Sequence, residues 1–353
     1  MNFRKIVLAL ALGGIIIACE NDDNNDPVMA QGDFENGILV TNEGPFNNGT
    51  GTVSFISEAL DTVGNAIYNS VNGSDLGNIV QSIGFSGNKA YIVANVSNTI
   101  TVVDRYTFEE LAVIDTGLDN PRYFVAVNGT GYVTNWGDGM DETDDFIALV
   151  DLESNTITGS IPVPFGPEDI LASGSTVYVA HQGAFGFNDK ISVIDADTDA
   201  VSDTITVGAV PNSMQLDAAG DLWVLSAGKP NFSGEETAGR LQKIAVQTAT
   251  VTTTFDFEVT EHPNHLSLDG STLYYSLDGN VFGLDTDATA LPAESDFSGL
   301  SIYGMTTNRG RLYTTDAKDF ASNGDLNIFS LDTKSEIGSF EVGIIPGGVY
   351  FNE

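Results

Sequence analysis

The sequence contains few basic residues and a single cysteine. Thirteen lysines and arginines are outnumbered by 49 aspartates and glutamates among 353 residues, and the formal net charge at pH 7 is −36. A nucleic-acid-binding surface needs clustered lysine and arginine to neutralise phosphates, so the composition excludes nucleic acid as an expected partner. Because Cys19 is the only cysteine, the chain can form no internal disulfide.

Sequence patterns of several enzyme classes are also missing. The chain shows no Ser-His-Asp arrangement, no phosphate-binding glycine loop and no CxxC pair. It has three histidines, of which His262 and His265 lie three residues apart in a segment expected to be extended. Two such residues without a third donor make a poor zinc site. The sequence therefore predicts a protein without catalytic activity, cofactor or bound metal.

No apolar run is long enough to cross a membrane as a helix. Ile6–Ala18 follows the basic pair Arg4 and Lys5, spans thirteen residues and ends in small residues directly before Cys19. This pattern predicts a lipoprotein signal peptide over residues 1–18, with Cys19 as the lipidated first residue of the mature chain. The anchored protein is expected to touch the membrane only through its lipid.

Residues 19–36 are polar and acidic and are predicted to form a flexible tether. An acidic tract directly after the lipid-bearing cysteine resembles the surface-export signal of Bacteroidetes lipoproteins. That resemblance predicts an outer-membrane protein that faces the cell exterior. A plain solvated linker facing the periplasm is the alternative.

The rest of the sequence is rich in glycine and in short β-prone runs. Between Pro167 and Pro211 lie four runs of Val, Ile, Thr and Tyr separated by Gly, Asn, Asp and Ser, which indicates four strands joined by tight turns. The predicted third strand of this unit ends at Asp195. The equivalent positions along the chain are Ser57, Asp104, Asp151, Asp195, Ala245, Asp285 and Asp332.

These seven positions are 47, 47, 44, 50, 40 and 47 residues apart. A four-stranded repeat of roughly 40–50 residues is typical of a β-propeller. We therefore predict an all-β fold of seven four-stranded antiparallel blades over residues 37–353, forming one domain. Residues 346–351 match a first strand and are expected to complete the first blade together with residues 37–62, which removes free sheet edges.

Three segments carry a resemblance to a known family. They are YVTN at 132–135, YVAH at 178–181 and YIVAN at 91–95, and the third strands read ITVVD and ISVID. The chain resembles the YVTN-repeat, YncE-like propellers, whose superfamily includes the quinoprotein amine dehydrogenase β-chain-like folds. With its signal, acidic tether and length, it is most similar to Bacteroidetes surface lipoproteins that partner TonB-dependent transporters. The best-understood of these capture cobalamin, and no cobalamin-contact motif can be matched here residue by residue.

The predicted loops between second and third strands are long and share one face of the propeller. They span 42–47, 136–145, 182–189, 228–239 and 317–324, whereas the turns of the opposite face are short. Aromatic residues on these loops are expected to supply contact area around a central channel, and polar residues at the ends of the second strands are expected to supply polar contacts. The predicted ligand-contacting residues are Asn42, Phe46, Asn135, Trp136, His181, Phe185, Phe187, Phe232, Asp316 and Phe320.

Acidic residues fall into two groups. The aspartates that end third strands recur in five blades and are interpreted as Asx turns. The loop 138–145 occurs once and holds five acids without the spacing of an EF-hand, so a solvated loop and a calcium site both stay open.

Three functions remain open at this point. The chain is interpreted first as a monomeric binding lipoprotein that captures a small nutrient ligand, corrinoid-like or siderophore-like, for an outer-membrane transporter. The second interpretation is a protein-interaction or adhesive propeller, and the third is a lactonase-like enzyme.

Overall fold

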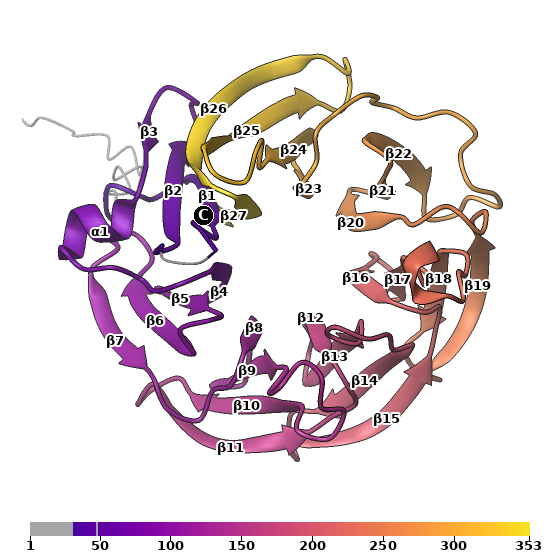
Figure 1. The fold of residues 1–353 in the computed structure, drawn as a ribbon, viewed down its shortest axis with the longest axis horizontal. Helices are drawn as coiled ribbons and strands as arrows, with labels where there is room; N and C mark the ends of the chain where they lie inside the picture. Colours follow the sequence, from indigo (N-terminus) through magenta and orange to yellow (C-terminus); the bar gives the residue numbers. More distant parts are fainter. Residues whose placement is uncertain (1–30, 47–48) are drawn as a thin grey trace, which may run out of the picture.

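Seven β-sheets form a ring around a central axis. The structure, a computed structural model, describes residues 31–46 and 49–353, and Figure 1 shows the sheets following one another in chain order. Each sheet is one blade of a propeller, and its first-named strand below lies nearest the axis. Among the described residues, no helix has the length and apolar character needed to span a membrane.

The blades contain the following strands. Blade 1 holds β27 (Pro346–Asn352), β1 (Gly37–Asn42), β2 (Thr52–Ser57) and β3 (Val63–Gly64); blade 2 holds β4 (Val80–Ser86), β5 (Lys89–Ala94), β6 (Thr99–Asp104) and β7 (Glu110–Ile114). Blade 3 holds β8 (Pro121–Val127), β9 (Thr130–Asn135), β10 (Phe146–Asp151) and β11 (Thr156–Pro162); blade 4 holds β12 (Pro167–Ser173), β13 (Thr176–His181), β14 (Lys190–Asp195) and β15 (Ala200–Thr206).

The remaining blades complete the ring. Blade 5 holds β16 (Pro211–Leu216), β17 (Leu222–Ser226), β18 (Arg240–Ala245) and β19 (Thr250–Asp256); blade 6 holds β20 (Asn264–Asp269), β21 (Thr272–Leu277) and β22 (Asn280–Asp285). Blade 7 holds β23 (Gly304–Asn308), β24 (Arg311–Asp316), β25 (Asn323–Ser330) and β26 (Glu336–Ile344). A short helix, α1 (Ile67–Asn72), follows β3, and a 3₁₀ turn, η1 (Asn231–Ser233), lies between β17 and β18.

The predicted seven-bladed fold is confirmed. The middle strands are buried on both faces, as in β9 and β13, whereas outer strands such as β11 and β15 alternate between exposed and half-buried residues. Neighbouring blades pack these faces together: Tyr91 and Val93 of blade 2 share one core with Val133 and Ala148 of blade 3. The alternation therefore marks the outer rim of each blade, where one face has no neighbour.

The repeat positions identified in the sequence match the strand ends closely. Six of the seven predicted third-strand ends are the last residues of β2, β6, β10, β14, β18 and β22, and β25 ends two residues early, at Ser330. The Asx-turn interpretation holds at Asp104, Asp151 and Asp195, each of which accepts a backbone N–H two residues on at 2.9–3.1 Å.

The last strand closes the ring as predicted. β27 pairs antiparallel with β1, with Val349 opposite Val40 and Phe351 opposite Ile38. Phe351 also packs edge-to-face on Tyr313 of blade 7, with ring centroids 5.1 Å apart. N-terminal and C-terminal segments thus share one sheet, which covers the edge that each would otherwise expose.

Blade 6 differs from the expected four strands. β22 is the outermost strand of its sheet, and an isolated bridge between Val281 and Phe297 stands where a fourth strand would pair. The segment 286–303 that follows β22 contains Pro292 and several small and acidic residues, which have low β-propensity. A single bridge is all the pairing that this sequence forms with β22.

The end of the predicted tether belongs to the folded part. Phe34 packs its ring edge-to-face on Phe55 and Phe108 at 5.3 and 5.4 Å, and its N–H donates to the carbonyl of Tyr106 at 2.9 Å. The expectation of a flexible segment through residue 36 is therefore wrong at its end, because Phe34 finds an apolar site at the seam of blades 1 and 2. Residues 1–30, which include Cys19 and the predicted signal peptide, lie outside the described residues.

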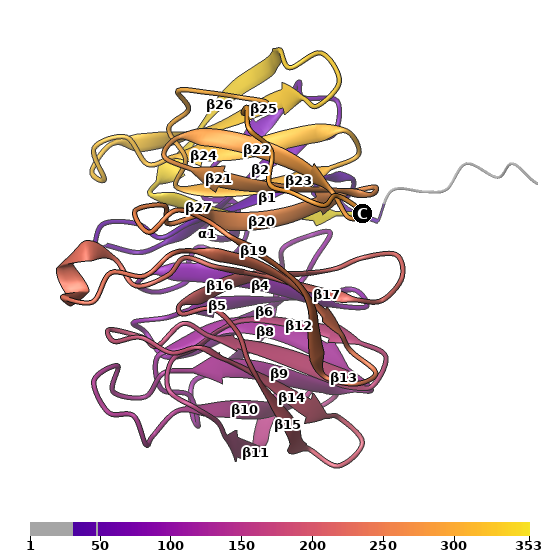
Figure 2. The same ribbon diagram turned by 90° about the vertical axis from the view of Figure 1, so that its right-hand side faces the viewer.

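The two ends of the propeller differ in their loops. Figure 2 shows the coil that contains η1 at one end and the C-terminus at the other. We call the end that bears the loops after the second strands the long-loop face, and the opposite end the short-turn face. The described chain begins on the short-turn face, where Phe34 meets Tyr106 in the turn after β6.

Left-handed residues fix the roots of the long loops. Asn120, Val210 and Ile345 have φ of 55°, 59° and 54°, and each stands directly before the proline that begins an inner strand. Their carbonyls accept N–H groups from the first residues after the second strands, which are Trp136, Ala227 and Glu43 respectively, at 2.9–3.2 Å. This conformation is strained for β-branched residues, so the surrounding packing must hold it. It fixes where each long loop departs from its blade.

Removal of β27 tests the ring closure. A chain that ends at Ile345 would expose both the β1 edge and the core that Val349 and Phe351 cover. We expect its thermal midpoint to fall by on the order of 10 °C, or the protein to aggregate, as measured by calorimetry. A synthetic peptide of residues 346–353 added in trans should restore most of the loss, and removal of Glu353 alone should change little. An unchanged midpoint for the shortened chain would contradict closure by β27.

Candidate functional site

The residues predicted at the ends of second strands are structural. Asn42, Asn135 and His181 end β1, β9 and β13, and all three are fully buried. The Asn42 side chain accepts the N–H of Gly343 in blade 7 at 3.0 Å, and that of Asn135 accepts the N–H of Asp119, in the connection from blade 2, at 2.9 Å. The prediction that these side chains contact a ligand is wrong, because all three are enclosed and expose no surface.

His181 is likewise held inside blade 4. Its Nε2 lies 2.8 Å from the Ser192 hydroxyl, and burial lowers the pKa of the imidazole to about 3. A neutral, enclosed imidazole is a packing residue here. Asp316 is half-buried, and its carboxylate accepts from the Ser301 hydroxyl at 2.8 Å and from the Lys318 N–H at 2.7 Å. It therefore caps the start of the blade 7 loop while keeping some exposed surface.

Trp136 lies beneath the long-loop face. Its indole N–H donates to the Pro167 carbonyl at 2.9 Å, and the residue is 7 % exposed. The Arg122 guanidinium stacks on one face of the ring, 4.1 Å from its centroid, and the Phe185 ring packs edge-on at 5.8 Å. Trp136 thus supports groups that reach the surface, and the prediction that it supplies ligand contact area is wrong.

The other predicted aromatic residues are exposed. The blade 4 loop contributes Phe185 and Phe187, which are 72 % and 36 % exposed, and the blade 5 loop contributes Phe232, which is 86 % exposed. On the adjacent blade 3 loop, Met140 is 74 % exposed. We call these four side chains the aromatic crest. Figure 1 shows the η1 coil over β18, well outside the ring of inner strands. At this end the crest lies away from the channel, whereas Phe185 packs on Trp136, which stacks against Arg122 of the inner strand β8.

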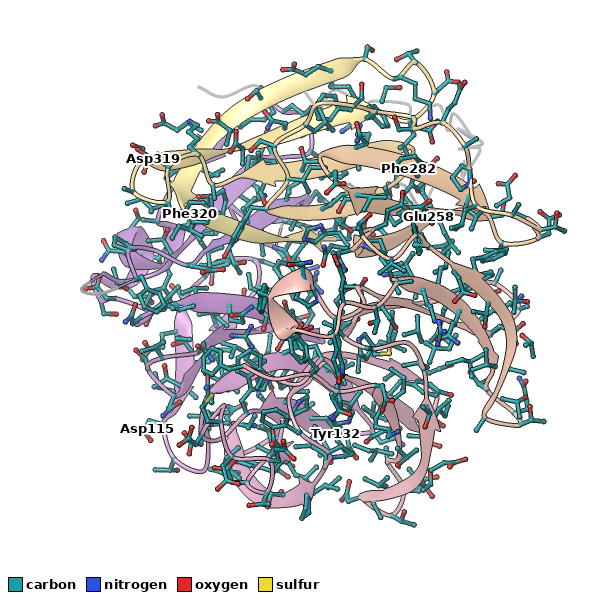
Figure 3. The ribbon with its side chains drawn as sticks, turned by 45° about the vertical axis from the view of Figure 1, so that its right-hand side comes forward. Asp115, Tyr132, Glu258, Phe282, Asp319 and Phe320 are labelled. Carbon is teal, nitrogen blue, oxygen red and sulfur yellow. The ribbon has the colours of Figure 1, made fainter. Side chains whose placement is uncertain are left out.

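Phe46 and Phe320 belong to the opposite sector, on blades 1 and 7. They are 70 % and 55 % exposed, and Phe320 packs edge-to-face on Tyr303 with centroids 5.5 Å apart. Figure 3 shows Phe320 beside Asp319 on the loop after β24. Of these two, Phe320 reaches toward the channel through its contact with Tyr303.

Four charged or phenolic groups gather at the entrance to the central channel. Arg122 and Glu168, the second residues of β8 and β12, form a two-point ion pair with distances of 2.9 and 2.7 Å. Across the axis, the Tyr303 hydroxyl donates to the Glu43 carboxylate at 2.8 Å. We call these four residues the channel mouth. They come from blades 1, 3, 4 and 7, so only the closed ring brings them together.

The channel mouth is electrostatically coupled. Burial raises the pKa of the Glu43 carboxyl, while the hydrogen bond from Tyr303 and the charge of Arg122 oppose that rise. The charge of Glu168 raises the pKa of Arg122 against the effect of burial. The neighbouring carboxylate thus stabilises the charged form of the guanidinium where little solvent surrounds it. Titratable groups with perturbed pKa values that cluster together are a recognised mark of a functional site.

A second layer of titratable groups lies deeper in the channel. Burial raises the pKa of Asp169 to about 7, although its carboxylate accepts the Met214 N–H at 2.8 Å. Burial also raises the pKa of Tyr350 to about 12 and that of Tyr123 further. Asp169, Tyr123 and Tyr350 belong to the inner strands β12, β8 and β27, and each keeps some exposed surface.

The channel mouth was missed in the sequence. Its signal is a charged residue directly after the proline that begins an inner strand, as in Pro121-Arg122 and Pro167-Glu168. Such a position points toward the axis only if the proline begins the innermost strand. Charge alone did not single out Glu168 among 49 acidic residues.

The remaining candidates have separate partners. His262 bonds the Ala227 carbonyl at 2.8 Å and His265 bonds Ser276 at 2.9 Å, so the two imidazoles do not act together. In the acidic loop, Asp145 is buried, accepts the Gly166 N–H at 2.8 Å, and has its pKa raised to about 7 by burial. In the part of the chain that the structure describes, no group of three His, Cys, Asp or Glu residues is arranged to hold a metal ion.

Comparison with known families places the chain. A family model described as a domain of unknown function, DUF5074, matches residues 36–282. The chain belongs to the DUF5074 family. No curated protein matches it significantly.

Solved structures similar to this DUF5074 protein share its fold. A quinoprotein alcohol dehydrogenase-like protein from Bacteroides thetaiotaomicron is 15 % identical with a TM-score of 0.66, covering 91 % of this chain and 79 % of that one. Hydrazine synthase from Kuenenia stuttgartiensis is 19 % identical with a TM-score of 0.55, covering 71 % and 76 %. BamB from Moraxella catarrhalis is 17 % identical with a TM-score of 0.53, covering 86 % and 82 %. At such low identity these likenesses establish the propeller fold alone.

Trp136 and Phe232 of the DUF5074 protein should differ sharply in their effect on stability. Trp136→Ala removes a buried ring and its hydrogen bond, so we expect the free energy of unfolding in urea to fall by roughly 3–5 kcal/mol. Phe232→Ala removes an exposed ring and should change it by no more than about 0.5 kcal/mol. Equal stability of wild type and Trp136→Ala would contradict the assignment of Trp136 as a supporting residue.

Asp169 should make stability depend on pH. Its pKa is about 7 in the folded DUF5074 protein, against an ordinary value of 3.8 for an aspartate. Between those values the native state binds one more proton than the unfolded state, so this residue lowers the free energy of unfolding as pH rises from about 4 to about 7. Urea unfolding should show wild type losing stability relative to Asp169→Asn over that range, with a constant difference above it. Parallel plots of the free energy of unfolding against pH for the two proteins would contradict this. Glu153→Gln, which changes an exposed carboxylate, serves as the control.

Proposed function

We propose that this chain is a surface-anchored lipoprotein that captures a small nutrient ligand at its channel mouth for an outer-membrane transporter. The observation that carries the proposal is the convergence of Glu43, Arg122, Glu168 and Tyr303 from four blades at one entrance. A ligand site is commonly a concavity with a few convergent polar groups and perturbed pKa values. The ligand class, corrinoid-like or siderophore-like, comes from the family resemblance.

The chemistry of the mouth suits a ligand with several polar substituents. Arg122 offers hydrogen-bond donors, Glu43 and Glu168 offer acceptors, and Tyr303 can serve as either. In the free protein these groups satisfy one another, so a ligand that replaces those contacts must offer both donors and acceptors. Phe320, which rests on the Tyr303 ring, adds apolar surface beside them. Amide-bearing or hydroxamate-bearing rings match this combination.

The position of the chain ends supports anchoring through Cys19. The described chain begins on the short-turn face, at the opposite end from the long loops (Figure 2). An anchor attached through the preceding residues would leave the long-loop face clear of its own attachment point. Cys19 itself lies outside the described residues, and fractionation of wild type and Cys19→Ala between membrane and soluble pools tests the anchor.

A protein-interaction function is the second candidate. The aromatic crest favours it, because Met140, Phe185 and Phe232 project large apolar surfaces into solvent. The crest and the channel mouth have no residue in common, so one chain can carry both activities. No contact among the described residues of the channel mouth specifically favours the lactonase-like interpretation.

Removal of the Tyr303 hydroxyl tests the proposal, because that group is part of the channel mouth. Wild type should bind one of cyanocobalamin, haem or a ferric siderophore at one to one in native mass spectrometry and calorimetry. Tyr303→Phe removes the hydrogen bond to Glu43 and should weaken that binding about fivefold, equivalent to ~1 kcal/mol.

The matched control is Tyr68→Phe. Tyr68 also bonds a carboxylate, that of Glu110, but it belongs to α1, which lies outside the ring of inner strands (Figure 1). The Tyr68→Phe variant should bind the ligand as wild type does. If none of the three compounds binds, or if both phenylalanine variants bind equally well, the channel mouth is not the capture site.

A further inference from the structure

The aromatic crest is one continuous surface built by three loops. The Phe185 N–H donates to the Gly139 carbonyl at 3.3 Å, which joins the loop of blade 4 to that of blade 3. A Cβ at Gly139 would stand 2.8 Å from the Phe185 ring, so the two loops touch closely. The Phe187 and Phe232 rings, from blades 4 and 5, lie 6.5 Å apart. Met140, Phe185, Phe187 and Phe232 therefore form neighbouring parts of one patch.

Exposure of this patch is unfavourable in the isolated protein. Single exposed apolar side chains are ordinary, whereas a contiguous group marks a surface that another molecule covers. Packing cannot explain it, since Met140, Phe185 and Phe232 are each more than 70 % exposed. Trp136 supports Phe185 from below, so the ring is held outward by a buried neighbour.

Unpaired negative charge borders the crest. Asp138, Asp141, Glu142 and Asp144 are exposed around Met140, and none of them forms an ion pair within the described residues. The lysines of the neighbouring loops are already engaged: Lys190 pairs with Asp189 at 2.7 Å, and Lys229 pairs with Glu235 at 3.5 Å. The border of the crest beside Met140 thus carries uncompensated acid.

We propose that the crest is a docking surface for a protein partner that presents an amphipathic segment with lysine or arginine beside aliphatic side chains. The apolar side chains of that segment would cover Phe185, Phe187 and Phe232, and its basic groups would meet the acids around Met140. Complementary charge at an interface speeds association and suppresses wrong partners. A second copy of this chain is a poor occupant, because it would bring the same acids against one another.

This inference stands apart from the proposed ligand capture, since it uses different residues. The test uses the purified protein and a labelled 14-residue peptide of leucine and lysine with one apolar face. Fluorescence anisotropy should show binding about tenfold tighter than to a scrambled peptide of equal composition, and weaker binding at high salt. Phe185→Ser with Phe232→Ser should abolish that tenfold preference, equivalent to ~1.4 kcal/mol.

Two further comparisons distinguish specific binding at the crest from nonspecific attraction of a basic peptide to an acidic protein. Asp141→Asn with Asp144→Asn should weaken peptide binding and flatten its salt dependence, whereas Asp115→Asn with Glu153→Gln, which remove exposed charges elsewhere, should do neither. Leu111→Ser with Ile337→Ser, which remove exposed apolar groups from outer strands, should bind as wild type. The proposal fails if wild type does not distinguish the amphipathic peptide from the scrambled one, or if these control variants lose as much binding as the crest variants. Binding of the small ligand is measured in parallel on the Phe185→Ser, Phe232→Ser variant. That measurement tests the channel mouth independently of the crest.

Discussion

Pairing of β27 with β1 is the interaction on which the rest of the structure depends. It places the last strand nearest the axis in the sheet that the first strands begin. Glu43 follows β1 directly, and its N–H is held by the carbonyl of Ile345, one residue before β27. The channel mouth therefore exists only in the closed ring, because its members come from blades that closure makes neighbours across the axis.

Hydrogen bonds join each blade to the next around the closed ring. Side chains of one blade bond the inner-strand backbone of the next at six seams, and the seam between blades 1 and 2 uses a backbone pair. The pairs are Gly51 N to Gly77 O, Ser82 to Arg122 O, Thr134 to Glu168 O, Asp169 to Met214 N, Ser213 to Leu266 N, Ser267 to Thr307 N and Thr315 to Gly347 O, all at 2.6–3.2 Å. Two of these bonds end on the backbone of Arg122 and Glu168. The same contacts that align the inner strands thus also set the position of the charged pair at the mouth.

The long-loop face contains two regions with different electrostatics. At the channel mouth, Arg122 is paired with Glu168, and Tyr303 with Glu43, so the charges are largely compensated and shielded from water. At the crest, apolar rings stand in solvent next to acids without partners. Compensated, enclosed groups suit recognition of polar substituents by exchange of hydrogen bonds, and uncompensated acid beside exposed rings suits a larger basic partner. Oxygen-tipped side chains over much of the remaining surface, visible in Figure 3, fit the overall charge of −36.

The sequence by itself determined the blades, because strand period, turn residues and repeat spacing are local properties. It located six third-strand ends to the residue and identified residues 346–351, which lie in β27, as the strand that completes blade 1. Where sequence reasoning failed, contacts between blades decided the outcome. Trp136 looks like an exposed loop aromatic, yet the carbonyls of Asn120 and Pro167 draw its backbone and indole inward. Asn42, Asn135 and His181 share a column, but whether that column faces a channel or a neighbouring blade depends on the rotation of each sheet. The channel mouth joins residues as distant in sequence as Glu43 and Tyr303, and no local pattern encodes which distant residues the closed ring brings together.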